Sequence, residues 1–82
     1  MPWLDFIWVA GDGGNVEHIA QHGISQDEVE EVVQNPDRID VSRSSGRPIA
    51  FGYTSEGRYI AVVYEEVDET TIYPITAYDS GD

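Results

Sequence analysis

The C-terminal half of the chain constrains the fold most, because three stretches with strand character are joined there by very short turns. In each stretch apolar side chains alternate with others, which is the period-two pattern of a β-strand. The stretches span residues 48–54, 58–66 and 71–78. The turns at 55–57 and 68–69 are too short to carry the chain back across a sheet. We therefore expect an antiparallel meander.

Two more stretches and one proline complete the predicted sheet. Residues 3–9 are rich in aromatic and branched side chains and stop at the glycine-rich segment 11–14, so we expect a first strand followed by a turn. A short strand over 39–43 is a further expectation. Pro74 has no amide hydrogen to donate, so the last strand should form an edge or carry a β-bulge there.

A short helix is predicted directly after the glycine-rich segment. Three of its residues share one apolar face at helical spacing. They are Val16, Ile19 and Ala20. Asn15 is suited to the N-cap position, and Gly23 is suited to a left-handed C-cap.

A second helix has a stronger start signal. Ser25 and Glu28 have the spacing of a capping box, in which the hydroxyl and the carboxylate bond free amides at the helix start. Ile24 and Val29 are spaced as a hydrophobic staple across it. The apolar stripe consists of Val29, Val32 and Val33. Pro36 ends the helix, and because both helices are too short to persist alone, both must pack against the sheet.

This order of elements predicts an α+β fold in which two short N-terminal helices pack on an antiparallel, three- to four-stranded meander. A chain of 82 residues has room for one small core. We therefore expect a single domain over residues 1–82, with residues 79–82 as a mobile tail.

Charge limits the partners that such a domain can bind. All four cations are arginines between residues 38 and 58, lysine is absent, and sixteen acids give a net charge of −12. Such a chain repels phosphate over most of its surface, so we expect no DNA binding and no broad RNA-binding face. RNA could meet only a local site of arginine and tyrosine. The competing interpretation is that the four arginines simply pair with acids.

Other functional classes are excluded by composition. Cysteine is absent, which removes disulfides, thiolate catalysis and cysteine metal sites. The N-terminus lacks the signal-peptide pattern, and no apolar run approaches the length of a membrane span, so we expect a cytoplasmic protein without membrane contact. His18 and His22 have the spacing of a metal pair, but only nonspecific carboxylates could complete the site. We expect no metal and no cofactor.

The arginines are the best candidates for a functional site. Arg47 and Arg58 stand at the starts of adjacent predicted strands, and five tyrosines are nearby in the sheet. Guanidinium stays charged and can bind phosphate through two parallel hydrogen bonds. Tyrosine rings on an open sheet face can stack on bases.

Several segments together resemble the BrnT-type toxins and their relatives. They are Phe6-Ile-Trp8, residues 17–25, residues 27–33 with Asn35-Pro36, residues 52–58 and residues 73–77. The most specific parts are the joint His22-Gly-Ile-Ser25 and the Thr-x-x-Gly-Arg hairpin that ends at Arg58. The resemblance spans about residues 6–78 and implies a RelE-like ribonuclease fold, translation-blocking RNA cleavage and a helical antitoxin as partner.

The sequence departs from that family at several basic positions. Gln21 stands where members carry a basic residue before the His-Gly, and the chain ends soon after Tyr78 and Asp79, where members run into a basic tail. Basic residues that usually follow the first-strand Trp are also missing from residues 9–14. Arg58 is the basic position that carries over.

Two hypotheses of different classes follow. The first is a BrnT-like endoribonuclease in which Arg58 and Arg47 stabilise the phosphorane and Tyr78 or His22 assists proton transfer. The second is a non-catalytic acidic module on the same fold. It would bind a basic partner protein, or form a homodimer, through the exposed sheet edge and aromatic side chains.

Overall fold

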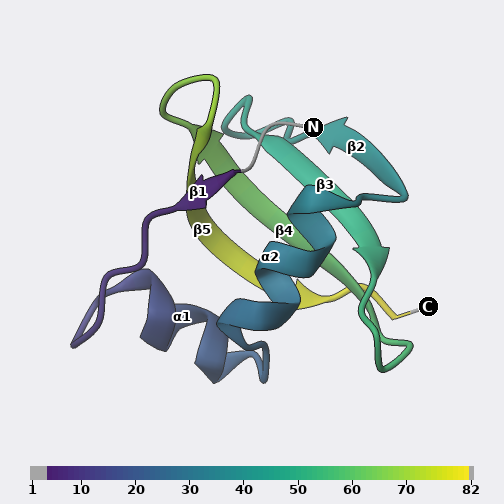
Figure 1. Ribbon diagram of the computed structural model, residues 1–82, viewed down its shortest axis with the longest axis horizontal. Helices are drawn as coiled ribbons and strands as arrows, with labels where there is room; N and C mark the ends of the chain where they lie inside the picture. Colours follow the sequence, from purple (N-terminus) through teal and green to yellow (C-terminus); the bar gives the residue numbers. More distant parts are fainter. Residues whose placement is uncertain (1–3, 82) are drawn as a thin grey trace.

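The computed structural model describes residues 4–81 and has two helices against a five-stranded sheet (Figure 1). In chain order the elements are β1 (Asp5–Phe6), α1 (Asn15–Gln21), α2 (Gln26–Gln34), β2 (Arg38–Val41), β3 (Pro48–Tyr53), β4 (Tyr59–Glu66) and β5 (Thr71–Asp79). The predicted α+β class is confirmed. Helix α2 packs on β3 and β4, and α1 packs on β5.

The sheet differs from the prediction in its strand count and in the direction of one edge. Its order is β1-β5-β4-β3-β2, and all neighbours are antiparallel except β1, which runs parallel to β5. The predicted antiparallel meander is present as β2 to β5, but the sheet exceeds the predicted three or four strands by the parallel edge strand β1. Strands β1 and β5 are separated by the whole remaining domain, so no short turn dictates their relative direction. Only Asp5 and Phe6 pair, with Thr71 and Ile72.

The strands of the meander follow the predicted bounds closely. Strand β1 is shorter than the expected 3–9, and Trp3 lies outside the described residues. Strand β5 extends to Asp79, one residue into the predicted tail, and the amide of Ser80 donates to the carbonyl of Tyr59 at 2.9 Å. Asp82 lies outside the described residues.

Of the two expectations at Pro74, an edge or a β-bulge, the structure has the bulge, since β5 lies between β1 and β4. The register between β4 and β5 shifts between Val63, which faces Thr76, and Tyr64, which faces Pro74. The carbonyl of Pro74 accepts a buried hydrogen bond from Asn15 Nδ2 at 3.0 Å. A residue without an amide hydrogen is tolerated here because the ladder is already interrupted.

Asn15 does not cap α1, which corrects the prediction. Gly14 is the N-cap and provides no side-chain hydrogen bond. The Asn15 side chain is buried instead, and it accepts from the amide of Val9 at 2.7 Å and donates to the carbonyl of Ile7 at 2.8 Å. A buried amide needs such partners, and the irregular backbone after β1 supplies them.

The helix joint is formed largely as predicted. Gly23 has a φ of +76°, a left-handed conformation that favours glycine, and its amide donates to Ala20. Ser25 and Glu28 form the capping box, with hydrogen bonds of 3.2 and 3.0 Å. Of the predicted α1 face, Ile19 is buried, Val16 is half-buried, and Ala20 is exposed because α1 contributes only a narrow face to the core.

The core lies between the helices and one face of the sheet. Its buried members include Ile19, Ile24, Val29, Val32, Val33, Ala50, Ile60, Val62, Tyr64, Ile72 and Ala77. Gly52 lies under α2, and a Cβ there would come within 3.3 Å of Val32 Cγ1. Since side chains alternate along a strand, the neighbours of these core residues point to the opposite face.

We call that opposite side of the sheet the open face. It carries the side chains of Phe51, Tyr53, Tyr59 and Tyr78. Along each strand these residues alternate with residues whose side chains face the helices. Within residues 4–81 both helices lie on the other side of the sheet (Figure 1). The fold thus leaves an aromatic sheet face uncovered by the described elements.

Candidate functional site

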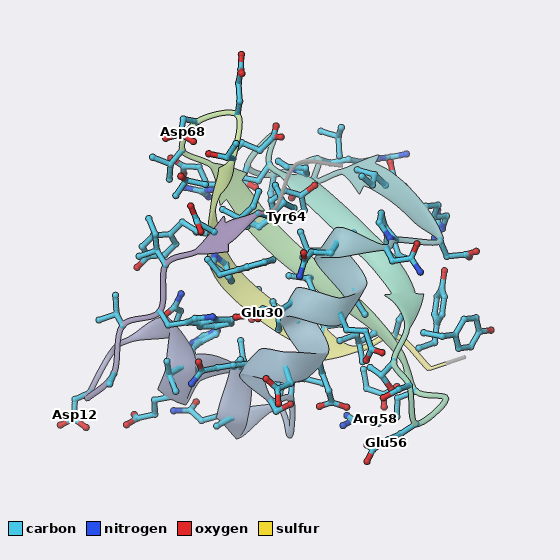
Figure 2. All side chains as sticks on the ribbon, in the orientation of Figure 1. Asp12, Glu30, Glu56, Arg58, Tyr64 and Asp68 are labelled. Atoms are coloured by element: carbon cyan, nitrogen blue, oxygen red, sulfur yellow. The ribbon has the colours of Figure 1, made fainter. Side chains whose placement is uncertain are left out.

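The four predicted site residues do not form one site. Arg58 immediately precedes β4, whereas Arg47 contacts Glu65, which lies in β4 seven residues after Arg58. At about 3.3 Å per residue, this separation is roughly 23 Å. Figure 2 shows the two ends, with Arg58 beside Glu56 at one and Asp68, just after β4, at the other. Arg47 and Arg58 therefore cannot act on one phosphate.

Arg58 is held at the helix joint by three groups. Its Nη1 donates to the carbonyl oxygen of Gly23 at 2.9 Å and lies 3.4 Å from Glu28 Oε2. Its Nε lies 3.5 Å from Asp79 Oδ2. The side chain is 33% exposed, and two carboxylates face its single positive charge. This guanidinium links the α1–α2 joint to the ends of β4 and β5.

Two of the other arginines are also engaged. Arg47 Nε pairs with Glu65 Oε1 at 3.3 Å. Arg38 pairs with Asp40 at 3.6 Å, and its guanidinium carbon lies 4.2 Å from the centre of the Phe51 ring. Within residues 4–81, Arg43 makes no side-chain hydrogen bond and no ion pair. The interpretation that arginines pair with acids therefore describes three of the four.

His22 and Tyr78 lie at the Arg58 end of the sheet but on different surfaces. His22 is the C-cap of α1 and precedes Gly23, whose carbonyl Arg58 binds. Tyr78 faces Ala61 on the open face, while its neighbour Asp79 turns toward Arg58. The structure thus brings His22 and Arg58 to one joint and separates Tyr78 from them by the sheet.

The surface around Arg58 is unfavourable for an anion. A groove of about 470 Å³ lies between the start of α2 and the β3–β4 turn. Its charged lining consists of Asp27, Glu28, Glu31, Glu56 and Arg58. One cation among four carboxylates gives a negative groove, which repels a phosphate group.

The histidine pair on α1 has no further ligand nearby. The ring centroids of His18 and His22 are 5.6 Å apart. Among residues 4–81, no three His, Cys, Asp or Glu side chains gather as a metal ion would require. No helix in this part of the chain is long and apolar enough to cross a membrane.

The open face carries a continuous row of aromatic rings. Phe51 and Tyr59 stack with centroids 6.2 Å apart, and Tyr53 is tilted against Tyr59 at 4.6 Å. Arg38 extends the row over Phe51, and the Tyr59 hydroxyl donates to Asp37 Oδ2 at 3.3 Å. The exposed fractions of Tyr53 and Tyr78 are 59% and 38%, whereas Tyr59 is half-buried and Phe51 is buried.

The sequence indicated the tyrosines but not this row. The row results from the alternation of Phe51 and Tyr53 along β3 together with the pairing of Tyr53 and Tyr59 across the hairpin. Tyr64 behaves differently, because it faces the helices and burial, followed by the charge of Glu66, raises the pKa of its hydroxyl. Asp37 carried no sequence signal, since its contact with Tyr59 depends on the sheet.

The fold and these contacts define a small acidic α+β domain whose cations are mostly paired and whose sheet has an aromatic open face. Residues 16–79, from α1 to the end of β5, match the sequence profile described as "Domain of unknown function (DUF4258)". The chain belongs to this family. No curated protein and no solved structure matches it. The resemblance to BrnT-type toxins stays a prediction.

Proposed function

We propose that this chain is a non-catalytic protein-binding module that docks a basic partner protein on its open face. The aromatic row carries the proposal: Tyr53 is exposed and Tyr59 is half-buried, while Phe51 is buried and stacks against Tyr59. Aromatic side chains are enriched at protein interfaces, because they offer large contact areas at a low cost in side-chain entropy.

Charge identifies the kind of partner. The net charge of −12 favours encounter with a basic surface and opposes encounter with nucleic acid. The same charge disfavours a homodimer, since a second copy would bring another −12 to the interface. A basic protein is therefore the occupant that we propose for the open face.

The contacts of Arg58 make catalysis the weaker alternative. A phosphorane would need this guanidinium, yet Glu28 and Asp79 already lie 3.4 and 3.5 Å from it. Arg47 is at the other end of β4. Both guanidinium groups would have to leave their carboxylates before they could stabilise negative charge on a substrate.

One observation favours a second candidate function, a BrnT-like endoribonuclease with a RelE-like fold and a helical antitoxin. His22 directly precedes Gly23, whose backbone carbonyl accepts a hydrogen bond from Arg58, so the two residues meet the same joint through the backbone. A histidine and an arginine at one place suit general acid–base chemistry on RNA. The activity of this candidate would depend on residues at the helix joint, whereas the binding module depends on residues of the open face.

Induced expression, combined with RNA analysis, distinguishes the two functions. We expect wild-type protein to be harmless to the host and to leave bulk RNA uncut. Toxicity and RNA cleavage that disappear in both His22→Gln and Arg58→Ala would overturn the binding module. His22→Gln is the more informative variant, because His22 is exposed and its side chain makes no hydrogen bond within the described residues.

The partner itself supplies the positive test. We expect purification from the native host to recover a basic protein whose binding weakens at high salt. That binding should weaken about tenfold or more for Tyr53→Ser and persist for His22→Gln. Binding that is insensitive to Tyr53→Ser and to Tyr78→Ser, the two exposed tyrosines, would contradict a role for the open face.

A further inference from the structure

A pocket lies at the rim of the open face, where α2 ends and the chain enters β2. Its volume is about 300 Å³, and its lining consists of Asn35, Pro36, Asp37 and Tyr53. We call it the Asp37 pocket. One wall is an exposed aromatic ring, and another is an exposed carboxylate.

The carboxylate of Asp37 is oriented but not neutralised. Its Oδ2 accepts from the Tyr59 hydroxyl at 3.3 Å. Its Oδ1 has no hydrogen-bond partner within residues 4–81, and none of the four ion pairs involves Asp37. The adjacent cation, Arg38, is directed to Asp40 and to the Phe51 ring.

The end of α2 adds negative potential to the same pocket. Carbonyl groups of the last helical turn are not all paired, and they carry the negative end of the helix dipole. Basic residues often compensate this end, but the last turn of α2 contains none. Asn35 and Pro36, which line the pocket, directly follow this turn.

The aromatic wall also attracts a cation. Tyr53 and Tyr59 have ring centroids 4.6 Å apart and are tilted by 54°. The faces of such rings are electronegative and bind guanidinium and ammonium groups. The open face already contains one such contact, because Arg38 lies over Phe51 at 4.2 Å.

We infer that the Asp37 pocket binds an arginine side chain of the partner protein, with the guanidinium stacked on Tyr53 and hydrogen-bonded to Asp37. Arginine suits the pocket better than lysine, because a planar guanidinium can stack on a ring and donate to a carboxylate at the same time. This inference rests on the proposed function in one respect, namely that the arginine comes from a partner protein.

A titration with small probes tests the pocket without the partner. The probe is N-acetyl-arginine methylamide, followed by the amide and tyrosine NMR signals of the full chain. The matched neutral control is the citrulline analogue, which has nearly the same shape. We expect saturable shifts concentrated at residues 35–38 and at Tyr53 and Tyr59, with the lysine analogue weaker and the citrulline analogue nearly silent.

Variants distinguish the contribution of the Asp37 carboxylate to arginine binding from that of the Tyr53 ring. Asp37→Asn should weaken arginine binding roughly tenfold, which is typical for loss of a hydrogen bond to a charged group. Tyr53→Leu should weaken it roughly threefold, as expected for an exposed cation–π contact, and Tyr53→Phe should preserve it. Glu69→Gln is the charge-matched control, since Glu69 is exposed in the β4–β5 turn at the far end of the sheet.

Several outcomes would overturn the inference. They are shifts spread evenly over the acidic surface, equal binding of the citrulline analogue, and equal weakening by Glu69→Gln and Asp37→Asn. If the partner binds Asp37→Asn as tightly as wild type, the partner does not use the Asp37 pocket. This result would overturn the inference but leave the proposed binding module in place. Conversely, probe binding at Asp37 together with RNA cleavage by the chain would leave the pocket in place and overturn the binding module.

Discussion

Replacing Arg58 with alanine should destabilise the domain, because one guanidinium joins three elements. The variant loses the hydrogen bond to Gly23 and the ion pairs to Glu28 and Asp79. A hydrogen bond from a charged donor contributes about 1 kcal/mol, and each partly exposed ion pair contributes about 0.5 kcal/mol after allowance for solvent screening. The free energy of unfolding should therefore fall by roughly 2 kcal/mol.

Urea denaturation followed by tryptophan fluorescence measures this loss. For a domain of this size, 2 kcal/mol corresponds to a decrease in melting temperature of about 10 °C. Arg47→Ala is the matched control, since it removes the same charge but only one exposed ion pair, with Glu65. It should change the free energy of unfolding by less than about 0.5 kcal/mol. Equal effects of the two variants would refute the structural role of Arg58.

Three further predictions concern local features of the fold. Ser25→Ala removes the hydroxyl of the capping box and should lower the free energy of unfolding by about 1 kcal/mol in urea denaturation, whereas Ser44→Ala in the β2–β3 loop should have little effect. Asn15→Leu leaves the amide of Val9 and the buried carbonyl of Pro74 without their partner and should cost about 2 kcal/mol or more; a neutral effect would contradict the role of this side chain. Hydrogen bonding to the amide of Thr70, followed by the side chain of Thr71, lowers the pKa of Asp68, so its contribution to stability is present above the pKa of the unfolded chain and is lost as pH falls through the folded value. Asp68→Asn should therefore flatten the acid side of the stability–pH profile, and an unchanged profile would contradict this.

Local sequence signals predicted most of the fold. The capping box at Ser25, the left-handed Gly23 and the bulge at Pro74 depend on residues close in the chain, and all three are present. Strand β1 could not be placed in this way. Its partner β5 lies more than sixty residues later, and only the folded core brings the two edges together.

The candidate site was predicted less well than the fold. The starts of two antiparallel neighbours lie at opposite ends, so the predicted meander itself already separates Arg47 from Arg58. The carboxylates that hold Arg58 come from α2 and β5, and only tertiary structure reveals them. Asp37 was missed for the same reason, because Tyr59 reaches it across β3.

The most direct test of the binding module compares two surfaces in one measurement. The dissociation constant of the purified native partner is measured by calorimetry for wild type, Tyr53→Ser on the open face and His22→Gln at the helix joint. We predict that Tyr53→Ser weakens binding about tenfold or more, as at an interface hot spot, while His22→Gln has no effect. Weakening by His22→Gln alone would place the functional surface at the joint and contradict the role of the open face.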